Sequence, residues 1–277
     1  MLIWEVLKAL LQGVVQGITE WLPISSTGHL ILVEAFLPFS LSAEFFELFK
    51  VLIQLGSIVA VIVMFFQKLN PFSKRKTLTE RRDTWRLWLM VVIASVPAMV
   101  IGLPFDDLIE TVLSSPIVIA ITLIVYGVLF IVMESFPRTP RLHTPNDVAW
   151  KTALLIGCFQ VLALIPGTSR SGSTILGAVL LGCSRYTAAE FSFFMAIPAM
   201  AGAGTLKVAK FLLEGNRLTP SEGLILGIGT LVSFAVSLFV IRFLMDFIKK
   251  HDFKVFGWYR IALGVILLIL ILVGALK

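Results

Sequence analysis

The stretch PGTSRSGS, residues 166–173, interrupts a run of apolar residues and decides the fold that we expect. The apolar segments on its two sides, 152–165 and 173–182, are each too short to cross a bilayer core, which takes about 20 helical residues. Non-helical backbone is tolerated at membrane depth only where protein or a water-filled cavity satisfies its polar groups. The stretch therefore predicts a broken or re-entrant helical hairpin with a polar tip.

A second stretch of the same kind, PISSTGH at residues 23–29, lies between the apolar segments 2–20 and 29–37. A shift of 144 positions without gaps aligns matching residues: Gly13 on Gly157, Gln16 on Gln160, Ser25 on Ser169 and Gly28 on Gly172. Short interrupted segments at matching places in two halves indicate a binding site between internal repeats. We predict one integral membrane domain, 1–277, with repeats at 1–134 and 148–277. Chance similarity between apolar helices is the alternative.

The composition places the whole chain in the membrane. Of its 277 residues, 58% are hydrophobic and 14% are charged, whereas about a quarter of a soluble domain is charged. Six segments are long enough to span a bilayer: 44–66, 85–104, 116–134, 187–210, 221–243 and 256–276. The expected fold is an all-α polytopic membrane protein with six full transmembrane helices and two broken hairpins. The net charge of +6 is clustered, which favours a role in topology and contact with anionic lipid over nucleic-acid binding.

The charge pattern predicts an orientation. The link 67–86 is rich in Lys and Arg and is expected in the cytoplasm. The link 105–115 contains Asp106, Asp107 and Glu110 without any Lys or Arg, and is expected outside. Counting onward places 244–255 inside and both termini outside. Three crossings in each half would invert the second repeat relative to the first, so that the two polar tips meet near the middle of the bilayer.

Gln16 and Glu20 are the first candidate site residues. They are four residues apart and share one face of a short helix. A carboxylate within an apolar helix is costly and usually faces a cavity or a partner. The alternatives are that Glu20 lies at a wet interface and that Gln16 makes a hydrogen bond between helices.

The first polar stretch adds hydroxyls and a histidine. Ser25, Ser26 and Thr27 precede His29, which can donate or accept a proton or bind a metal near neutral pH. Helix capping alone would explain Ser25 and Thr27, but it does not require the histidine. A lone buried histidine is usually satisfied by hydrogen bonds. With Glu20 and Ser26 nearby in the chain, we assign His29 a functional role.

The second polar stretch contains the most informative residue, Arg170. A central arginine costs roughly 2.5–3.5 kcal/mol on insertion scales, so an anion should offset it. A guanidinium matches phosphate oxygens, and the amides of a helix that starts near Ser173 add favourable dipoles. The candidate binding residues around it are Ser169, Ser171, Gly172 and Ser173. A structural salt bridge between Arg170 and Glu20 is the alternative, and it would also position Glu20.

These groups together describe a phosphate site with an acid, a histidine and hydroxyls. Physical reasoning alone leaves hydrolysis and transport of a phosphate compound open, because a secondary transporter can also have inverted repeats and a midplane site. A transporter needs the arginine but no nucleophile. A purely structural helical bundle would not explain two buried polar stretches.

Four stretches give the chain a resemblance to a known family: Gly13 to Leu30, Val51 to Val61, Pro166 to Ile175, and Leu181 to Pro198. They lie in both halves, and they resemble the bacterial undecaprenyl-pyrophosphate phosphatases that are associated with bacitracin resistance. The resemblance implies an enzyme of the bacterial inner membrane that converts undecaprenyl pyrophosphate to undecaprenyl phosphate and inorganic phosphate. This recycles the lipid carrier of cell-wall synthesis. A transporter or flippase of a prenyl phosphate lipid stays the alternative.

The resemblance also assigns roles to residues. Glu20, Ser26, His29 and Arg170 match the catalytic residues of the family, and Gln16 matches a position that is often Glu. The family implies an active site open to the outer, periplasmic side and a divalent cation, Mg²⁺ with Ca²⁺ as the alternative. Glu20 is the metal ligand that this chain retains. Ser26, His29 or a metal-bound water remains open as the nucleophile, and a homodimer remains open as the assembly.

Overall fold

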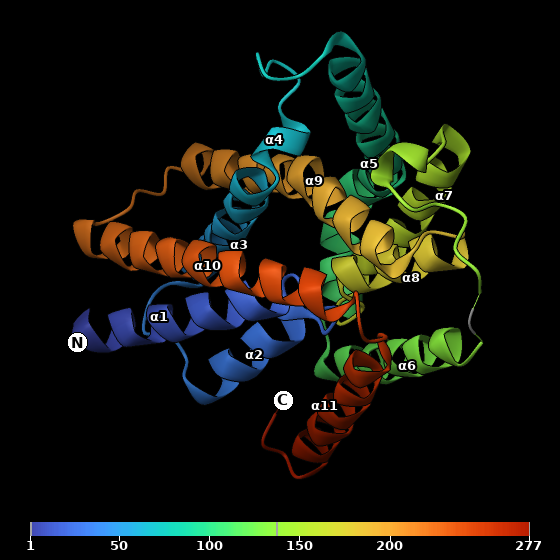
Figure 1. The fold of residues 1–277 in the computed structure, drawn as a ribbon. Coiled ribbons are helices and arrows are strands. Elements are labelled where there is room, and N and C mark those ends of the chain that lie inside the picture. The colour runs from blue at the N-terminus through green and yellow to red at the C-terminus, as the bar shows by residue number, and fades with distance from the viewer. Residues whose placement is uncertain (1, 137, 277) are drawn as a thin grey trace.

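The computed structural model describes residues 2–136 and 138–276, and this part of the chain is helical (Figure 1). It contains no β-strand, only an isolated bridge between Leu142 and Cys183. The first half consists of α1 (Leu2–Thr19), α2 (Ser26–Phe36), α3 (Ala43–Met64), α4 (Phe66–Leu69), α5 (Leu78–Leu113) and α6 (Pro116–Ser135). The second half, after the short η1 (Pro145–Asp147), consists of α7 (Trp150–Val161), η2 (Leu162–Leu164), α8 (Arg170–Leu180), α9 (Arg185–Leu213), α10 (Pro220–Phe247) and α11 (Lys254–Leu272). The expected all-α membrane fold is confirmed.

Within the described residues, seven helices are long and apolar enough to cross a membrane, one more than expected. The additional one is α1, which covers the segment 2–20 that we expected to be one arm of a broken hairpin and too short or too interrupted to cross. In the structure Glu5, Lys8 and Gln12 are buried against other parts of the protein. Glu5 accepts a hydrogen bond from Lys8 at 2.9 Å, and Gln12 donates one to Glu34 at 3.1 Å. These contacts let α1 continue as one helix of 18 residues.

The prediction of a link over residues 105–115 was wrong. Helix α5 continues to Leu113, so residues 114–115 alone separate it from α6. Ser115 ends the link as the N-cap of α6, where its side chain accepts a hydrogen bond from the Val118 amide. The side chains of Asp106, Asp107 and Glu110, on which the outward placement of this link rests, lie outside the described part of the chain.

Two broken hairpins are present where the polar stretches predict them. Helices α2 and α8 have 11 residues each, which gives a length of about 16 Å and is too short for a bilayer core of about 30 Å. Each begins after a serine with a positive φ, 76° at Ser25 and 72° at Ser169. Each serine side chain accepts a hydrogen bond from a glycine amide three residues later, at Gly28 or Gly172. The two polar stretches thus share one local backbone and one capping contact, whereas the repeats at 1–134 and 148–277 stay a prediction.

The two halves also pack on one another reciprocally. Helix α1 of the first half packs along α10 of the second, and α7 of the second half packs along α5 of the first (Figure 1). Helices α6 and α11 form a further pair. Exchange of this kind is expected of interlocked repeats. The inversion of one repeat relative to the other across a bilayer stays a prediction.

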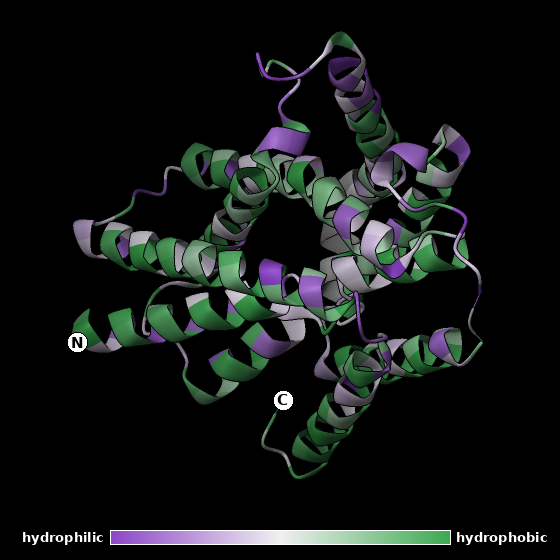
Figure 2. Ribbon diagram, in the orientation of Figure 1, coloured by the Kyte–Doolittle hydropathy of each residue, from purple (hydrophilic) through white to green (hydrophobic). Residues whose placement is uncertain are grey.

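The outer surface of the helices is apolar, as a lipid-facing surface must be. Large hydrophobic side chains such as Leu231 and Phe239 on α10, and Ile266 on α11, are exposed. Figure 2 shows hydrophobic residues along most helices, with hydrophilic residues at α4 and at the start of α5. The buried core gathers around Trp21 and the phenylalanines of α9.

Glycines bring several helices into close contact. A Cβ on Gly127 of α6 would lie 2.7 Å from the carbonyl oxygen of Gly257 on α11, and a Cβ on Gly257 would lie equally close to the Gly127 carbonyl. Small residues at such crossings let two backbones approach, as in other membrane helix pairs. The α6–α11 pair matters for the site because α11 contributes Tyr259 and Arg260 to it.

We predict that Gly127→Ala lowers the thermal unfolding midpoint in detergent by several degrees, because overpacking costs roughly 1–3 kcal/mol. The matched control is Gly227→Ala on α10, where an added Cβ meets nothing within 4 Å. The unfolding midpoint of the control should equal or exceed that of the parent, since alanine favours a helix more than glycine does. Equal midpoints for the two variants would show that the close approach is unimportant.

Candidate active site

The polar tips of the two hairpins meet at Glu20. Its Oε1 accepts a hydrogen bond from Arg170 Nη2 at 3.1 Å, across 150 residues of chain. Its Oε2 accepts from Gln16 Nε2 at 2.9 Å and from Ser26 Oγ at 3.0 Å, and Gln54 Nε2 lies at 3.5 Å. Glu20 is 4% exposed. Each of these neighbours donates to Glu20, so its two oxygens collect hydrogen bonds from both hairpins and from α3.

Ser26 and Arg170 occupy equivalent places in the two hairpins. Each is the first residue of its short helix and directly follows the serine cap with positive φ. This position holds the first side chain of a helix whose amides point toward the loop. The first repeat thus supplies a hydroxyl and the second supplies a cation, and Glu20 contacts both.

Arg170 is held on two sides, and its buried Nε–H has no partner among the described residues. Nη1 donates to the Ser192 carbonyl at 2.8 Å, and the guanidinium lies 5.8 Å from the centre of the Trp21 ring. Its Nε–H is buried and has no hydrogen-bond partner within the described chain. The side chain is 12% exposed. A buried unpaired donor is costly, and an anionic ligand or a water would satisfy it.

His29 contacts a residue that the sequence analysis missed. Its Nδ1 lies 2.6 Å from the Ser25 carbonyl oxygen, and its Nε2 lies 2.7 Å from the hydroxyl of Tyr259 on α11, with the two rings stacked. A carbonyl only accepts hydrogen bonds, so Nδ1 carries the proton and Nε2 is free to accept from Tyr259. No bond joins His29 to Ser26 among the contacts of the described residues.

The other predicted binding residues have mixed surroundings. Ser25 and Ser169 cap their helices. For Ser25, capping was the alternative to a role in binding. Ser171 donates to the Glu20 carbonyl at 3.1 Å and so joins the two hairpins. Ser173 is fully buried and donates to the Arg170 carbonyl. Gly172 is also buried, whereas Thr27 is exposed. Their roles in substrate binding stay predictions.

Arg260 on α11 joins the two polar stretches and was also missed. It is completely buried, and its Nη1 donates to the Pro23 carbonyl at 3.0 Å. Its Nη2 donates to the carbonyls of Gly167 and Thr168, each at 2.9 Å. The guanidinium also lies 5.4 Å from the centre of the Tyr126 ring. The signal was an arginine inside the apolar run 256–276, the same signal that revealed Arg170.

The comparisons with known proteins agree with one another. Residues 9–266 match the family described as Bacitracin resistance protein BacA. The chain belongs to this family. Among its relatives are the undecaprenyl-diphosphatase of Limosilactobacillus fermentum, 55% identical over 95% of this chain and 96% of that protein, and undecaprenyl-diphosphatase 1 of Clostridioides difficile, 56% identical over 95% of both chains. The undecaprenyl-diphosphatase of Enterococcus faecalis strain V583 is 53% identical over 97% of this chain and 98% of that protein.

Membership of the BacA family, together with the seven apolar helices, makes the chain a multi-pass bacterial membrane protein. The match spans both hairpins, so the site between them lies within the family region. The resemblance inferred from four stretches of sequence is thereby confirmed.

We predict that Arg260→Met lowers the thermal unfolding midpoint in detergent by several degrees, measured by tryptophan fluorescence. The change removes the donor from three buried carbonyls, and an unsatisfied buried group costs about 1–3 kcal/mol. The midpoint of Arg260→Lys should fall between those of Arg260→Met and the parent, because one ammonium does not reproduce the planar guanidinium group. Arg242→Gln removes an exposed arginine from α10 and serves as the control. An Arg260→Met midpoint equal to that of the control would contradict a stabilising role.

Proposed function

We propose that the chain hydrolyses undecaprenyl pyrophosphate to undecaprenyl phosphate and inorganic phosphate. The observation that supports this best is the chain of contacts from Arg170 through Glu20 to Ser26, which puts a cation, a base and a hydroxyl within hydrogen-bond reach. The names of the relatives point to the same reaction. A carrier for the same lipid would need the cation but has no use for the Ser26–Glu20 bond.

The pyrophosphate would be held mainly by the second hairpin. Arg170 has a free Nε–H, and guanidinium groups suit phosphate oxygens. The N-terminus of α8 adds its partial positive charge. Phosphoryl transfer needs chiefly positioning and neutralisation of charge. On binding, the phosphate would compete with Glu20 for Arg170, which leaves Glu20 available to Ser26.

Ser26 is the nucleophile that this geometry favours. Its Oγ–H already points to Glu20 Oε2 at 3.0 Å, so Glu20 is placed to take the proton as Oγ attacks the terminal phosphorus. The bond from that phosphorus to the bridging oxygen breaks, and undecaprenyl phosphate leaves. Water then cleaves the phosphoserine to release inorganic phosphate and restore the hydroxyl. His29, whose Nε2 faces Tyr259, would exchange a proton with the leaving oxygen or with the attacking water.

The divalent cation is proposed to come with the substrate. Among the described residues, no group of three or more His, Cys, Asp or Glu is placed to hold a metal ion. The oxygen ligands near Ser26 are the Glu20 carboxylate and the side-chain amides of Gln16 and Gln54. Mg²⁺ is often bound by one or two carboxylates plus substrate phosphates, so this set fits a cation shared between Glu20 and the pyrophosphate. Bound there, it would neutralise phosphate charge, and Ca²⁺ is the alternative.

The location we propose is the bacterial inner membrane, with the site open to the periplasmic side. The basic link 67–86 supports this orientation, since it favours the cytoplasm. If α1 and α2 enter and leave the membrane on one side as a hairpin, both chain ends would then be outside. The contacts of Glu20, Ser26, His29 and Arg170 come from one chain. The proposed reaction therefore works in a single copy, and a homodimer stays a hypothesis.

The purified parent protein, given a prenyl pyrophosphate and Mg²⁺ in detergent, should release inorganic phosphate. Ser26→Ala should lower kcat on the order of 10³-fold or more, because the nucleophile is lost. The control Ser135→Ala removes an exposed hydroxyl on α6 and should match the parent. Near-parent turnover by Ser26→Ala would transfer the nucleophilic role to His29 or water. If the parent protein released no phosphate, the proposed phosphatase activity would be rejected.

Mg²⁺ binding should depend on the substrate phosphates. We expect calorimetric titration to give at least about tenfold tighter binding in the presence of a methylene-bridged prenyl pyrophosphate analogue than with protein alone, because one carboxylate makes a weak site. Glu20→Gln should abolish the gain, and Glu214→Gln, at an exposed position, should keep it. Tight stoichiometric binding to the protein alone would contradict a cation that arrives with its substrate.

A further inference from the structure

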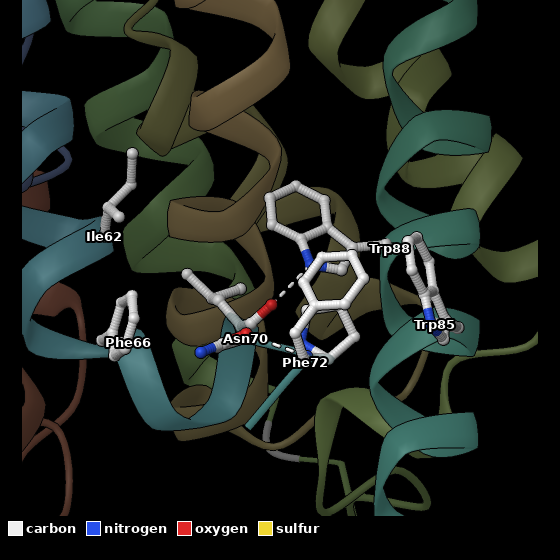
Figure 3. Close-up of a pocket in the computed structure, with 8 residues that line it drawn as sticks. Ile62, Phe66, Asn70, Phe72, Trp85 and Trp88 are labelled. Atoms are coloured by element: carbon white, nitrogen blue, oxygen red, sulfur yellow. Dashed lines mark hydrogen bonds between the residues drawn. The ribbon is translucent and has the colours of Figure 1, made fainter. Parts of the chain in front are cut away.

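An apolar groove lies away from the site, where α3, α4 and the start of α5 meet. It encloses about 420 Å³, and its lining residues are Ile62, Phe66, Leu69, Asn70, Pro71, Phe72, Trp85 and Trp88. Figure 3 shows Phe72, Trp85 and Trp88 around it, with Phe66 and Ile62 on the opposite side. None of the predicted catalytic residues contributes to this lining.

Two hydrogen bonds join polar atoms within the lining of the groove. Trp88 Nε1 donates to the Leu69 carbonyl at 2.8 Å, and Asn70 Oδ1 accepts from the Phe72 amide at 2.9 Å (Figure 3). The rest of the lining is mainly aromatic and aliphatic, so it offers a largely apolar wall. Such a wall favours a hydrocarbon chain over a polar ligand.

The groove is open at its aromatic rim. Phe66, Phe72 and Trp85 are more than half exposed, and the rings of Phe72 and Trp85 meet edge to face with centres 5.7 Å apart. Tryptophan is enriched where membrane helices meet the headgroup region, since its ring is apolar and its N–H is polar. The rim is thus placed for a lipid that enters from the bilayer.

Cationic side chains lie one helical turn from the groove. Arg81 and Arg82 precede Trp85 by four and three residues on α5, so they share its side of the helix. The Nε–H of Arg81 is buried without a partner, and Arg82 is exposed with no ion-pair partner among the described residues. The segment 67–86 has seven Lys or Arg against two acidic residues, Glu80 and Asp83. An anion is the ligand that this charge excess would attract.

We infer that this groove binds an anionic phospholipid. One acyl chain lies against Phe66, Phe72, Trp85 and Trp88, and the headgroup phosphate binds Arg81 and Arg82. The apolar groove and the cations are neighbours, as the acyl chain and the phosphate are neighbours in a phospholipid. The basic segment is expected on the cytoplasmic side, where anionic lipids would reach it.

The test compares phosphatidylglycerol with phosphatidylcholine of the same acyl chains, by native mass spectrometry of the full chain in detergent. The parent should retain one phosphatidylglycerol at least about tenfold more tightly than phosphatidylcholine. Arg81→Gln/Arg82→Gln should remove that preference. The control Lys249→Gln/Lys250→Gln removes two charges from the other basic link and should keep it.

A second measurement uses tryptophan fluorescence. Phosphatidylglycerol with brominated acyl chains should quench tryptophan fluorescence at lower concentration than brominated phosphatidylcholine, and Trp85→Phe should reduce the quenching. Circular dichroism and phosphate release in detergent should be unchanged in the arginine double variant, since neither arginine lies in the site. This check separates failure of the lipid site from failure of the enzyme.

Three results would overturn the inference. Equal retention of the two lipids by the parent would mean that the groove takes hydrocarbon without reading the headgroup. Displacement of the bound lipid by stoichiometric prenyl pyrophosphate would make the groove a substrate site. Loss of a dimer on Trp85→Ala, with lipid retention unchanged, would make it a contact between two copies of the chain.

Discussion

A buried guanidinium holds the centre of this protein together. Arg260 donates to carbonyls of both polar stretches, at Pro23, Gly167 and Thr168. These stretches cannot bond their own backbone as a helix does, and lipid offers no donors. A donor with several N–H groups in one plane satisfies carbonyls from two loops at once. Fixing the loops in this way fixes the helices that start from them, and therefore the distance between Glu20 and Arg170.

The two hairpins show how one backbone arrangement supplies two kinds of chemistry. Ser25 and Ser169 have nearly the same φ and cap their helices in the same way. The following residue differs, Ser26 in one hairpin and Arg170 in the other. An internal repeat with identical residues would bring two hydroxyls or two cations together. The difference at this position instead brings a hydroxyl and a cation to the same carboxylate.

The two carboxylate oxygens of Glu20 have different partners. Oε1 contacts the cation, and Oε2 contacts the hydroxyl and the amides of Gln16 and Gln54. Gln16 and Gln54 approach Oε2 as neutral hydrogen-bond donors, so Arg170 is the charged partner of this carboxylate.

The sequence by itself determined the membrane class and the two broken hairpins, and it singled out Glu20, Ser26 and Arg170, which the structure brings into contact. Those conclusions rest on local properties: the length of apolar runs, the residues that interrupt them, and the cost of Glu20 and Arg170 in oil. Only the tertiary structure decided that α1 is a full-length helix, that α5 runs to Leu113, and that Gln54, Tyr259 and Arg260 join the site. Tyr259 meets His29 across 230 residues. No periodicity encodes such a meeting, because it depends on how separate helices pack.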